Sequence, residues 1–512
     1  MSLDVLFINP GNHKKIYQEL SKDYSAIETP TWSLLLAESC RSVGYNVAIL
    51  DACAERLTDK QSVERIKEAN PRLICFVVYG QNPNSGTVNM SGTVALASAI
   101  KKANVEIPVA VVGSHTQALP YETLEKEQDI DIVFTNEGVY ALRNLLEQEN
   151  LADVSMLKNI KGIGYRRKGE VVLTPAERIV PQERMDLDLP GYAWDLLPFK
   201  EKPLDLYRAP MWHAEYIEEN RTPYAALYTS LGCMFKCSFC MINILNRNDN
   251  DPIGVASNYA GMRFWSPEFI IKEFDKLVEM GVKTLRISDE MFLLNRKYYV
   301  PLCNLIKERG YGDILNMWAY SRIDTVRKPE NLKLIREAGI RWLCLGIESG
   351  DKNVRLEVTK GRFEDVDIRE VVKMVHDADI EIIGNYLFGL PGDTYETMGT
   401  TMSLSKELCT LAWNAYAAMA LPGSLLYKFA LEEGHKLPDN YEGYSFHAYN
   451  TQPLPTEHLS PEQILEYRDN AWLEYHTYPP FLEKVEAKYG YEARENIEEM
   501  TKIKLRRKIL GD

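Results

Sequence analysis

From Ala225 to about Gly423 the sequence repeats one unit, in which a helix with an apolar face ends at a glycine and a strand follows. The first copy has a helix over 266–280, Gly281 as its stop, and a strand over 284–288. Two further copies cover 332–347 and 371–388. Repeats of this kind build a parallel sheet, so we expect a partial βα (TIM-like) barrel with functional residues at the carboxyl ends of its strands.

The first 150 residues alternate strands and helices in a second pattern. The predicted strands are Val5–Ile8, Val47–Leu50, Leu73–Tyr79, Val109–Val112 and Ile132–Phe134. This alternation predicts a doubly wound, Rossmann-like parallel sheet, whose ligands bind beyond the carboxyl ends of the strands. The loops expected there are rich in glycine and small polar residues, and they cover 9–13, 80–86, 113–116 and 136–138. Such loops suit close backbone approach to a large polar ligand.

Two further segments complete the predicted α/β organisation. Residues 151–222 contain many prolines and one hairpin signal, which predicts a mostly irregular linker. Residues 425–512 are aromatic-rich and predicted to be mostly helical, with aromatic stripes more typical of core packing than of a cofactor site. The expected domains are therefore 1–150, the linker, 223–424 and a helical C-terminal region.

Composition excludes several classes of protein. The 45% hydrophobic and 26% charged content is that of a globular protein, and the net charge of −14 argues against nucleic-acid binding. No apolar run reaches transmembrane length, and the first residues are expected to form a strand and not a signal peptide. Six of the nine cysteines are scattered without paired spacing, so we expect no disulfide framework and a reducing cytoplasm.

The other three cysteines, Cys233, Cys237 and Cys240, lie on one short loop after an apolar run. Thiolates this close can converge on one soft metal centre. Three ligands on a cluster of four irons leave one iron open to bind a cofactor or substrate. Zinc or buried free thiols are the alternatives, but zinc would need a fourth ligand, and no second C-x2-C or histidine pair follows.

This C-x3-C-x2-C spacing, with Phe239 before the last cysteine, resembles the radical S-adenosylmethionine (SAM) superfamily. The resemblance implies a [4Fe–4S] cluster whose open iron is chelated by the amino and carboxylate groups of SAM. It also implies an electron donor such as flavodoxin or ferredoxin, since reduction of the cluster cleaves SAM to a deoxyadenosyl radical.

Candidate SAM contacts follow the later strands of the barrel. The matching residues are Asp289 and Glu290, Ser321 and Arg322, Glu348, and Gly389. By resemblance the acidic pair would hold the SAM ammonium, the arginine the SAM carboxylate or substrate, and Glu348 the ribose, with Gly389 in the adenine-side loop. Each motif alone also fits a cap, a surface ion pair or a turn, so their order after the cysteine loop carries the interpretation.

The loops of the first 150 residues, placed ahead of this motif, resemble the cobalamin-binding domain of cobalamin-dependent (class B) radical SAM enzymes. The candidate cobalamin contacts are Asn82, Ser85, Gly113, Ser114, His115, Asn136, Glu137 and Gly138. The D-x-H-x-x-G signature that supplies a cobalt ligand is missing, and the first loop offers only His13. We therefore expect cobalamin without a protein histidine on cobalt. The alternative is a module that binds another ligand or only positions substrate.

The resemblance implies a methyltransferase that uses two SAM molecules per turnover. One SAM methylates cobalamin, and the other yields the radical that activates a carbon (or phosphorus) centre of a small-molecule biosynthetic intermediate. A ring closure or rearrangement with the same cofactors is the alternative. A methylthiotransferase would need a second cysteine set. Weak candidates for substrate contact are Tyr441, Tyr444, His447 and Tyr449.

Overall fold

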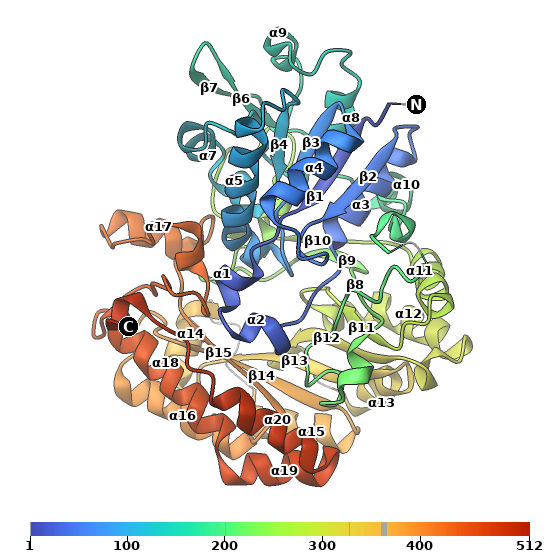
Figure 1. Cartoon of the computed structure of the whole chain (residues 1–512). Coiled ribbons are helices and arrows are strands. Elements are labelled where there is room, and N and C mark those ends of the chain that lie inside the picture. The colour runs from blue at the N-terminus through green and yellow to red at the C-terminus, as the bar shows by residue number, and fades with distance from the viewer. Residues whose placement is uncertain (1, 200, 327, 360–365) are drawn as a thin grey trace.

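The computed structural model describes residues 2–199, 201–326, 328–359 and 366–512. Two parallel sheets stand one above the other, with α1 and α2 between them and the C-terminal helices beside the lower sheet (Figure 1). In the described part of the chain, no helix is long and apolar enough to cross a membrane.

The first sheet has seven strands in the order β2-β1-β3-β4-β5-β6-β7. Its strands are β1 (Val5–Asn9), β2 (Val47–Asp51), β3 (Leu73–Val77), β4 (Val109–Val112), β5 (Ile132–Phe134), β6 (Ile163–Arg167) and β7 (Glu170–Leu173). The first five are parallel, as predicted. The predicted hairpin forms as β6 and β7, but it extends this sheet and does not lie in an irregular linker, because β6 pairs antiparallel with β5.

Helices cover both faces of the first sheet, as its near-continuous apolar strands require. They are α1 (His13–Tyr17), α2 (Leu20–Asp23), α3 (Thr31–Arg41), α4 (Asp59–Ala69), α5 (Gly86–Lys102), α6 (Ser114–Ala118), α7 (Pro120–Lys126), α8 (Val139–Leu146) and α9 (Val154–Leu157). Leu35 and Leu142 pack on one face, and Ile66 and Leu96 on the other. A short helix, α10 (Met185–Asp188), follows the sheet.

The second sheet has six parallel strands in the order β15-β14-β13-β12-β11-β8 and forms the predicted partial barrel. Its strands are β8 (Tyr224–Leu227), β11 (Thr284–Ile287), β12 (Asn316–Arg322), β13 (Ile340–Glu348), β14 (Glu381–Phe388) and β15 (Ala412–Ala417). The covering helices are α11 (Pro267–Glu279), α12 (Arg296–Glu308), α13 (Pro329–Glu337), α14 (Lys352–Thr359), α15 (Ile368–Asp377) and α16 (Tyr395–Leu408). Between β8 and β11, an antiparallel ribbon of β9 (Ser230–Cys233) and β10 (Gly261–Phe264) carries the cysteine loop.

The C-terminal region is helical, as predicted, with α17 (Leu425–Glu432), α18 (Pro461–His476), α19 (Pro479–Tyr489) and α20 (Tyr491–Thr501). Helix α18 packs on β14 and β15 through aromatic side chains. Tyr475 is fully buried and stacks on Trp413 at 4.9 Å between ring centroids. This contact is core packing and ties the C-terminal helices to the second sheet.

Buried polar contacts join the first sheet to the ribbon of the second unit. Arg263 on β10 pairs with Glu137, in the loop after β5, at 2.7 Å. Arg247 donates to the carbonyl of Thr135 at 3.3 Å. The carboxyl edge of the first sheet therefore faces the segment that carries the three cysteines.

Candidate active site

Several polar side chains with partly accessible surfaces lie near the carboxyl edge of the second sheet. They are Glu290, Tyr320, Glu348 and Tyr416 from that sheet and Tyr17 from α1. The first sheet approaches the same region, because Asn84, in the loop after β3, accepts from the Met241 amide at 2.9 Å, directly after the last of the three cysteines. We call the region between the two edges the chamber.

The cysteine loop forms one wall of this chamber. Cys233 ends β9, and its amide donates to Asn243 Oδ1 at 2.8 Å. Gly232, at φ 86°, is required there because a Cβ would lie 2.3 Å from the Gly261 carbonyl. Cys237 and Cys240 keep accessible surface, whereas Phe239 packs toward Leu390 and Leu426.

Burial raises the pKa of Cys233 to about 12 and that of Cys237 to about 11. These thiols are neutral at pH 7 unless a metal deprotonates them. Among the residues that the structure describes, no three His, Cys, Asp or Glu side chains surround a single ion. A cubane cluster needs no such site, because each thiolate binds a different iron, so the loop suits a cluster better than zinc.

The two acids after β11 differ in what they contact. The oxygens of Asp289 accept from the Thr229 amide at 2.5 Å and from the hydroxyls of Thr229 and Ser230 at 2.6 Å each. Asp289 therefore fixes the start of the ribbon, and its contact with SAM stays a prediction. Glu290 Oε1 is buried and has no partner in the structure. Burial raises the pKa of Glu290 to about 8, although Arg286 opposes this shift.

An unpartnered acidic oxygen in a chamber fits a cationic ligand. Of the two acids, Glu290 is therefore the better candidate to accept from a cationic group.

Arg322 and Ser321, at the end of β12, are engaged with neighbouring residues. The guanidinium of Arg322 binds both oxygens of Asp324 and stacks 3.5 Å from the ring centroid of Phe235. Ser321 shares a hydrogen bond of 2.7 Å with Thr325. The predicted SAM-carboxylate role of Arg322 would have to coexist with the Asp324 pair, and its closeness to Phe235 makes it a support of the cysteine loop.

Glu348 and Gly389 end the next two strands. Burial raises the pKa of Glu348 to about 7, and its backbone has a φ of 65°. Gly389 is required because a Cβ there would lie 2.5 Å from Ile464 on α18. The glycine thus serves helix packing, and the sequence cannot distinguish this from the predicted adenine contact.

Most of the polar residues predicted to contact cobalamin instead build the loops of the first sheet. Ser114 donates to the Pro83 carbonyl at 2.5 Å. His115 shares a hydrogen bond of 3.1 Å with Thr87, and burial lowers its pKa to about 3. Asn82 caps the short turn that contains Ser85, by accepting from the Asn84 amide at 3.0 Å.

The loop after β5 behaves in the same way. Asn136 donates to the Glu177 carbonyl at 2.7 Å and accepts from the Gly138 amide at 3.0 Å. Glu137 accepts from the Val180 amide at 2.5 Å in addition to its pair with Arg263. Both carboxylate oxygens of Glu137 thus have a protein partner, and its contact with cobalamin stays a prediction.

Glycines at the first sheet permit close backbone packing. A Cβ on Gly113 would lie 2.3 Å from the Val78 side chain, and one on Gly86 would lie 1.9 Å from Ser114 Oγ. The edge therefore presents a compact surface of backbone and small side chains, which suits a large, flat ligand.

His13 does not point an unpaired nitrogen into the chamber. Its Nδ1 lies 3.1 Å from Cys53 Sγ and its Nε2 lies 3.0 Å from the Ala26 carbonyl oxygen. Both ring nitrogens are engaged, which agrees with the expectation that His13 is no cobalt ligand.

The C-terminal candidates for substrate contact lie in different places. His447 is near the chamber, with its ring 5.2 Å from that of Tyr17, and burial lowers its pKa to about 3. Tyr449 is 37% exposed and donates to the Asp512 carbonyl, so it lies outside. Tyr441 donates to Glu127 at 2.7 Å, and Tyr444 is buried in an apolar cluster.

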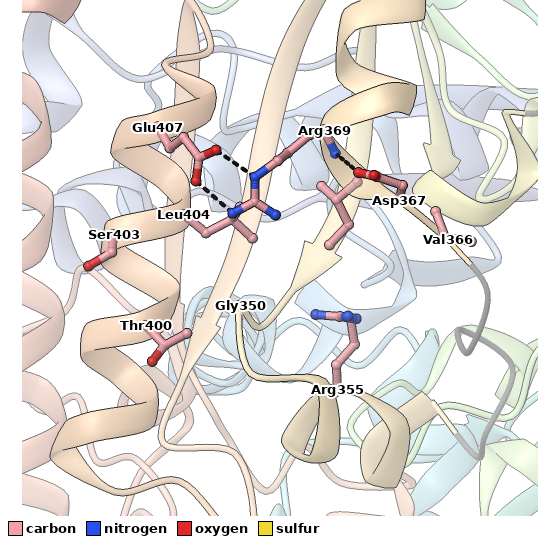
Figure 2. A pocket seen from close by; sticks show the side chains of 10 residues that line it. Gly350, Arg355, Val366, Asp367, Arg369, Thr400, Ser403, Leu404 and Glu407 are labelled. Carbon is pink, nitrogen blue, oxygen red and sulfur yellow. Dashed lines mark hydrogen bonds and ion pairs between the residues drawn. The ribbon is translucent and has the colours of Figure 1, made fainter.

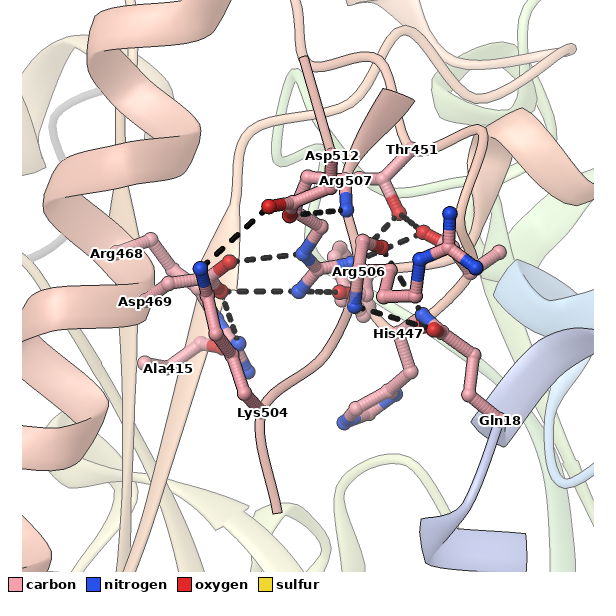
Figure 3. Close-up of polar contacts among 12 residues, drawn as sticks. Gln18, Ala415, His447, Thr451, Arg468, Asp469, Lys504, Arg506, Arg507 and Asp512 are labelled. Atoms are coloured by element: carbon pink, nitrogen blue, oxygen red, sulfur yellow. Dashed lines mark hydrogen bonds and ion pairs between the residues drawn. The ribbon is translucent and has the colours of Figure 1, made fainter. Parts of the chain in front are cut away.

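A buried arginine holds this wall in place (Figure 3). Arg507 pairs with Asp469 at 2.8 Å and donates to the carbonyls of Phe446 and Ala448. Gln18, just after α1, donates to the His447 carbonyl at 2.6 Å and accepts from the Arg506 amide at 3.1 Å. We call these contacts the C-terminal clamp.

A separate pocket of about 540 Å³ opens between α14, α15 and α16 (Figure 2). Arg369 and Glu407 form an ion pair on its wall, and Arg355 lies opposite. No residue predicted as a site lines it.

Comparison with known proteins agrees with this geometry. The chain matches the model of the radical SAM superfamily over residues 227–404 and that of the B12 binding domain over residues 23–146. An uncharacterized methyltransferase of Pyrococcus horikoshii is 25% identical over 442 residues, which are 86% of each chain. An anaerobic magnesium-protoporphyrin IX monomethyl ester cyclase of Cereibacter sphaeroides is 23% identical over 465 residues, 87% of this chain and 65% of the relative.

A solved structure has the same fold. The radical SAM methyltransferase TsrM of Kitasatospora setae, with cobalamin and a [4Fe–4S] cluster bound, matches with a TM-score of 0.65 at 16% identity. The match covers 98% of this chain and 99% of TsrM.

The two matched models show that this chain combines the radical SAM and B12-binding domains of the cobalamin-dependent radical SAM enzymes, and it shares the fold of TsrM. Its cofactors are a [4Fe–4S] cluster, SAM and cobalamin.

Proposed function

We propose that the chain transfers a methyl group to an unactivated carbon, or to phosphorus, of a small-molecule biosynthetic intermediate and consumes two SAM molecules per turnover. The observation that supports this most is that the carboxyl edges of the two sheets meet at the cysteine loop, through the contacts of Asn84 with Met241 and of Arg263 with Glu137. This arrangement would hold cluster, SAM, cobalamin and substrate within reach of one another, which is the main contribution a protein makes to cofactor chemistry.

In this proposal Cys233, Cys237 and Cys240 hold the cluster. When bound, the three cofactors supply the electron, the radical and the methyl group. Glu290 accepts from the SAM ammonium with its unpartnered oxygen, and Glu348 accepts from the ribose. The low-dielectric surroundings that raise the pKa values of both acids also strengthen their hydrogen bonds to a ligand.

The first sheet contributes a surface for cobalamin without a histidine for cobalt. His13 is engaged elsewhere, and the loops of Gly86 and Gly113 present backbone at close range. The enclosed walls, including the C-terminal clamp, exclude water and oxygen from a reactive radical. A flavodoxin or ferredoxin in a reducing cytoplasm is the electron source that we propose.

A cyclisation or rearrangement is the second candidate, because one relative that spans most of this chain is a cyclase. Both reactions use the same chamber and cofactors. They differ in the mass of the product, since methylation adds one CH2 unit and the alternatives add none.

The proposal is tested by anaerobic purification from a cobalamin-replete host. We expect about four irons and one cobalamin per chain, and SAM cleavage to deoxyadenosine on reduction. Candidate substrates with SAM carrying a deuterated methyl group should then yield a product with a retained label. Iron without cobalamin would contradict methyl transfer and reassign the first sheet to substrate binding, and an unlabelled product would favour the second candidate.

A further inference from the structure

Asn84 belongs to the loop after β3, on the first sheet, but its side chain contacts the cysteine loop of the second unit. Its Oδ1 accepts from the Met241 amide at 2.9 Å. Its Nδ2 lies 3.9 Å from Cys240 Sγ, a hydrogen-bond distance for sulfur. One side chain thus contacts both the third cysteine and the residue that follows it.

The backbone fixes the orientation of this amide. An Asn side chain can be placed with its oxygen and nitrogen exchanged. The Met241 amide is a donor and requires an acceptor, so Oδ1 must face it and the NH2 group must face the sulfur. The contact with Cys240 is therefore donation from Asn84.

The loop that carries Asn84 is held from several directions. Ser114 donates to the Pro83 carbonyl at 2.5 Å, and Asn82 accepts from the Asn84 amide at 3.0 Å. Arg286 on β11, fully buried, donates to the Gln81 carbonyl at 3.2 Å and pairs with Glu28 at 3.1 Å. These hydrogen bonds and the ion pair fix the position of the loop from which Asn84 contacts the sulfur.

Donation to a ligating sulfur stabilises the more negative, reduced form of an iron–sulfur cluster and raises its reduction potential. We propose that Asn84 is a positioning residue that links the cobalamin-facing edge of the first sheet to the cluster and raises the potential of that cluster. This inference rests on the cluster assignment of the proposed function. Through this contact, a residue of the first sheet would influence the reduction potential of the cluster that the second unit holds.

Two substitutions separate the two hydrogen bonds. Asn84→Ala removes both, whereas Asn84→Asp keeps the acceptor for Met241 and replaces the donor by a negative charge. We expect the potential to fall in the order wild type, Asn84→Ala, Asn84→Asp. Loss of the bond should lower the ratio of reduced to oxidised cluster about tenfold at fixed ambient potential, which is about 59 mV for one electron.

The experiment is a redox titration of the reconstituted full-length protein, followed by the electron paramagnetic resonance signal of the reduced cluster. Hydrogen exchange at Met241 is measured in parallel and should rise in Asn84→Ala but not in Asn84→Asp. Asn144→Ala is the matched control, because the Asn144 side chain donates to Glu177 and not to the cysteine loop, and it should keep the wild-type potential.

An unchanged potential in both Asn84 variants, with wild-type iron content, would overturn the inference. A fall in Asn84→Ala alone would also contradict it, since the effect would then come from the Met241 anchor. Failure of the proposed function looks different, because the wild-type protein itself would then hold no reducible cluster.

Discussion

The carboxyl edges of the two sheets face the same chamber, but they use their polar residues in opposite ways. At the second sheet, Glu290 keeps an oxygen without a partner among the residues that the structure describes, and Cys237 and Cys240 remain partly accessible. At the first sheet, the polar side chains form hydrogen bonds with neighbouring loops, as in Ser114, Asn136 and Glu137. The second sheet therefore presents side-chain groups to a ligand, whereas the first sheet presents mainly backbone and small side chains.

The largest effect is expected at the carboxyl edge of the second sheet. Cys240→Ala removes one of three cluster ligands and should abolish SAM cleavage while sparing cobalamin, because the first sheet is untouched. Iron content, deoxyadenosine formation and bound cobalamin measure this. Cys303→Ala, a buried cysteine far from the loop in the fold, is the control, and SAM cleavage by Cys240→Ala would contradict the cluster assignment.

The matching substitution at the carboxyl edge of the first sheet should affect cobalamin and spare the iron. Gly113→Ala places a Cβ 2.6 Å from the Val78 carbonyl oxygen, so the loop must move. We expect most of the cobalamin to be lost on gel filtration while iron content stays near wild type. Gly169→Ala is the control, because Gly169 is also replaced by alanine but lies at a hairpin turn with open space around it. Unchanged cobalamin content would show that the loop 113–116 does not bind it.

Glu137 tests whether the first sheet uses its polar residues structurally. Glu137→Ala leaves Arg263 buried without its counter-charge, which should cost about 3–5 kcal/mol of unfolding free energy. Denaturant titration measures this, with the exposed Glu147→Ala as control. Loss of cobalamin at unchanged stability would instead make Glu137 a cofactor contact.

Glu290 is the matching test at the second sheet. Glu290→Gln keeps the shape but removes the charge, so SAM affinity should fall roughly tenfold to hundredfold, as for a hydrogen bond to a charged group of about 1.5–3 kcal/mol. Anaerobic calorimetry on the cluster-loaded protein measures it.

The protonation of Glu290 gives a second readout. With a pKa of about 8 it is mostly neutral at pH 7 before SAM binds, and an ammonium favours the carboxylate. The amino group of SAM loses a proton to bind iron in both proteins, so binding at pH 7 should release about one proton more in the wild type than in Glu290→Gln, seen as different binding heats in two buffers. Equal release by both proteins would place the SAM ammonium elsewhere.

The smallest effect is expected at the C-terminal clamp. Arg507→Ala removes the ion pair with Asp469 and the hydrogen bonds to the 446–451 segment. The free energy of local opening of this segment should therefore fall by about 1–2 kcal/mol, and its hydrogen exchange should become faster than in the wild type. The exposed neighbour Arg506→Ala should leave exchange unchanged. Equal exchange in both variants would show that the C-terminal clamp does not hold the wall.

The sequence predicts the strands and their order because apolar runs and glycine stops are local signals. It also predicts that Glu290 and Glu348 end strands of the barrel. It cannot predict that Glu137 is neutralised by Arg263, which lies 126 positions away. Nor can it predict that Gly389 accommodates Ile464, or that Asn84 reaches Cys240, since these pairs meet only through tertiary packing. Asn84 carries no signal that separates it from the polar residues beside it.

The bond between Gln18 and Arg506 joins residues 488 positions apart. During synthesis on the ribosome, the cysteine loop emerges more than two hundred residues before Arg506 does. The C-terminal clamp can therefore form only when the chain is almost complete, and until then Gln18 and the segment around His447 lack the contacts that Arg506 and Arg507 supply.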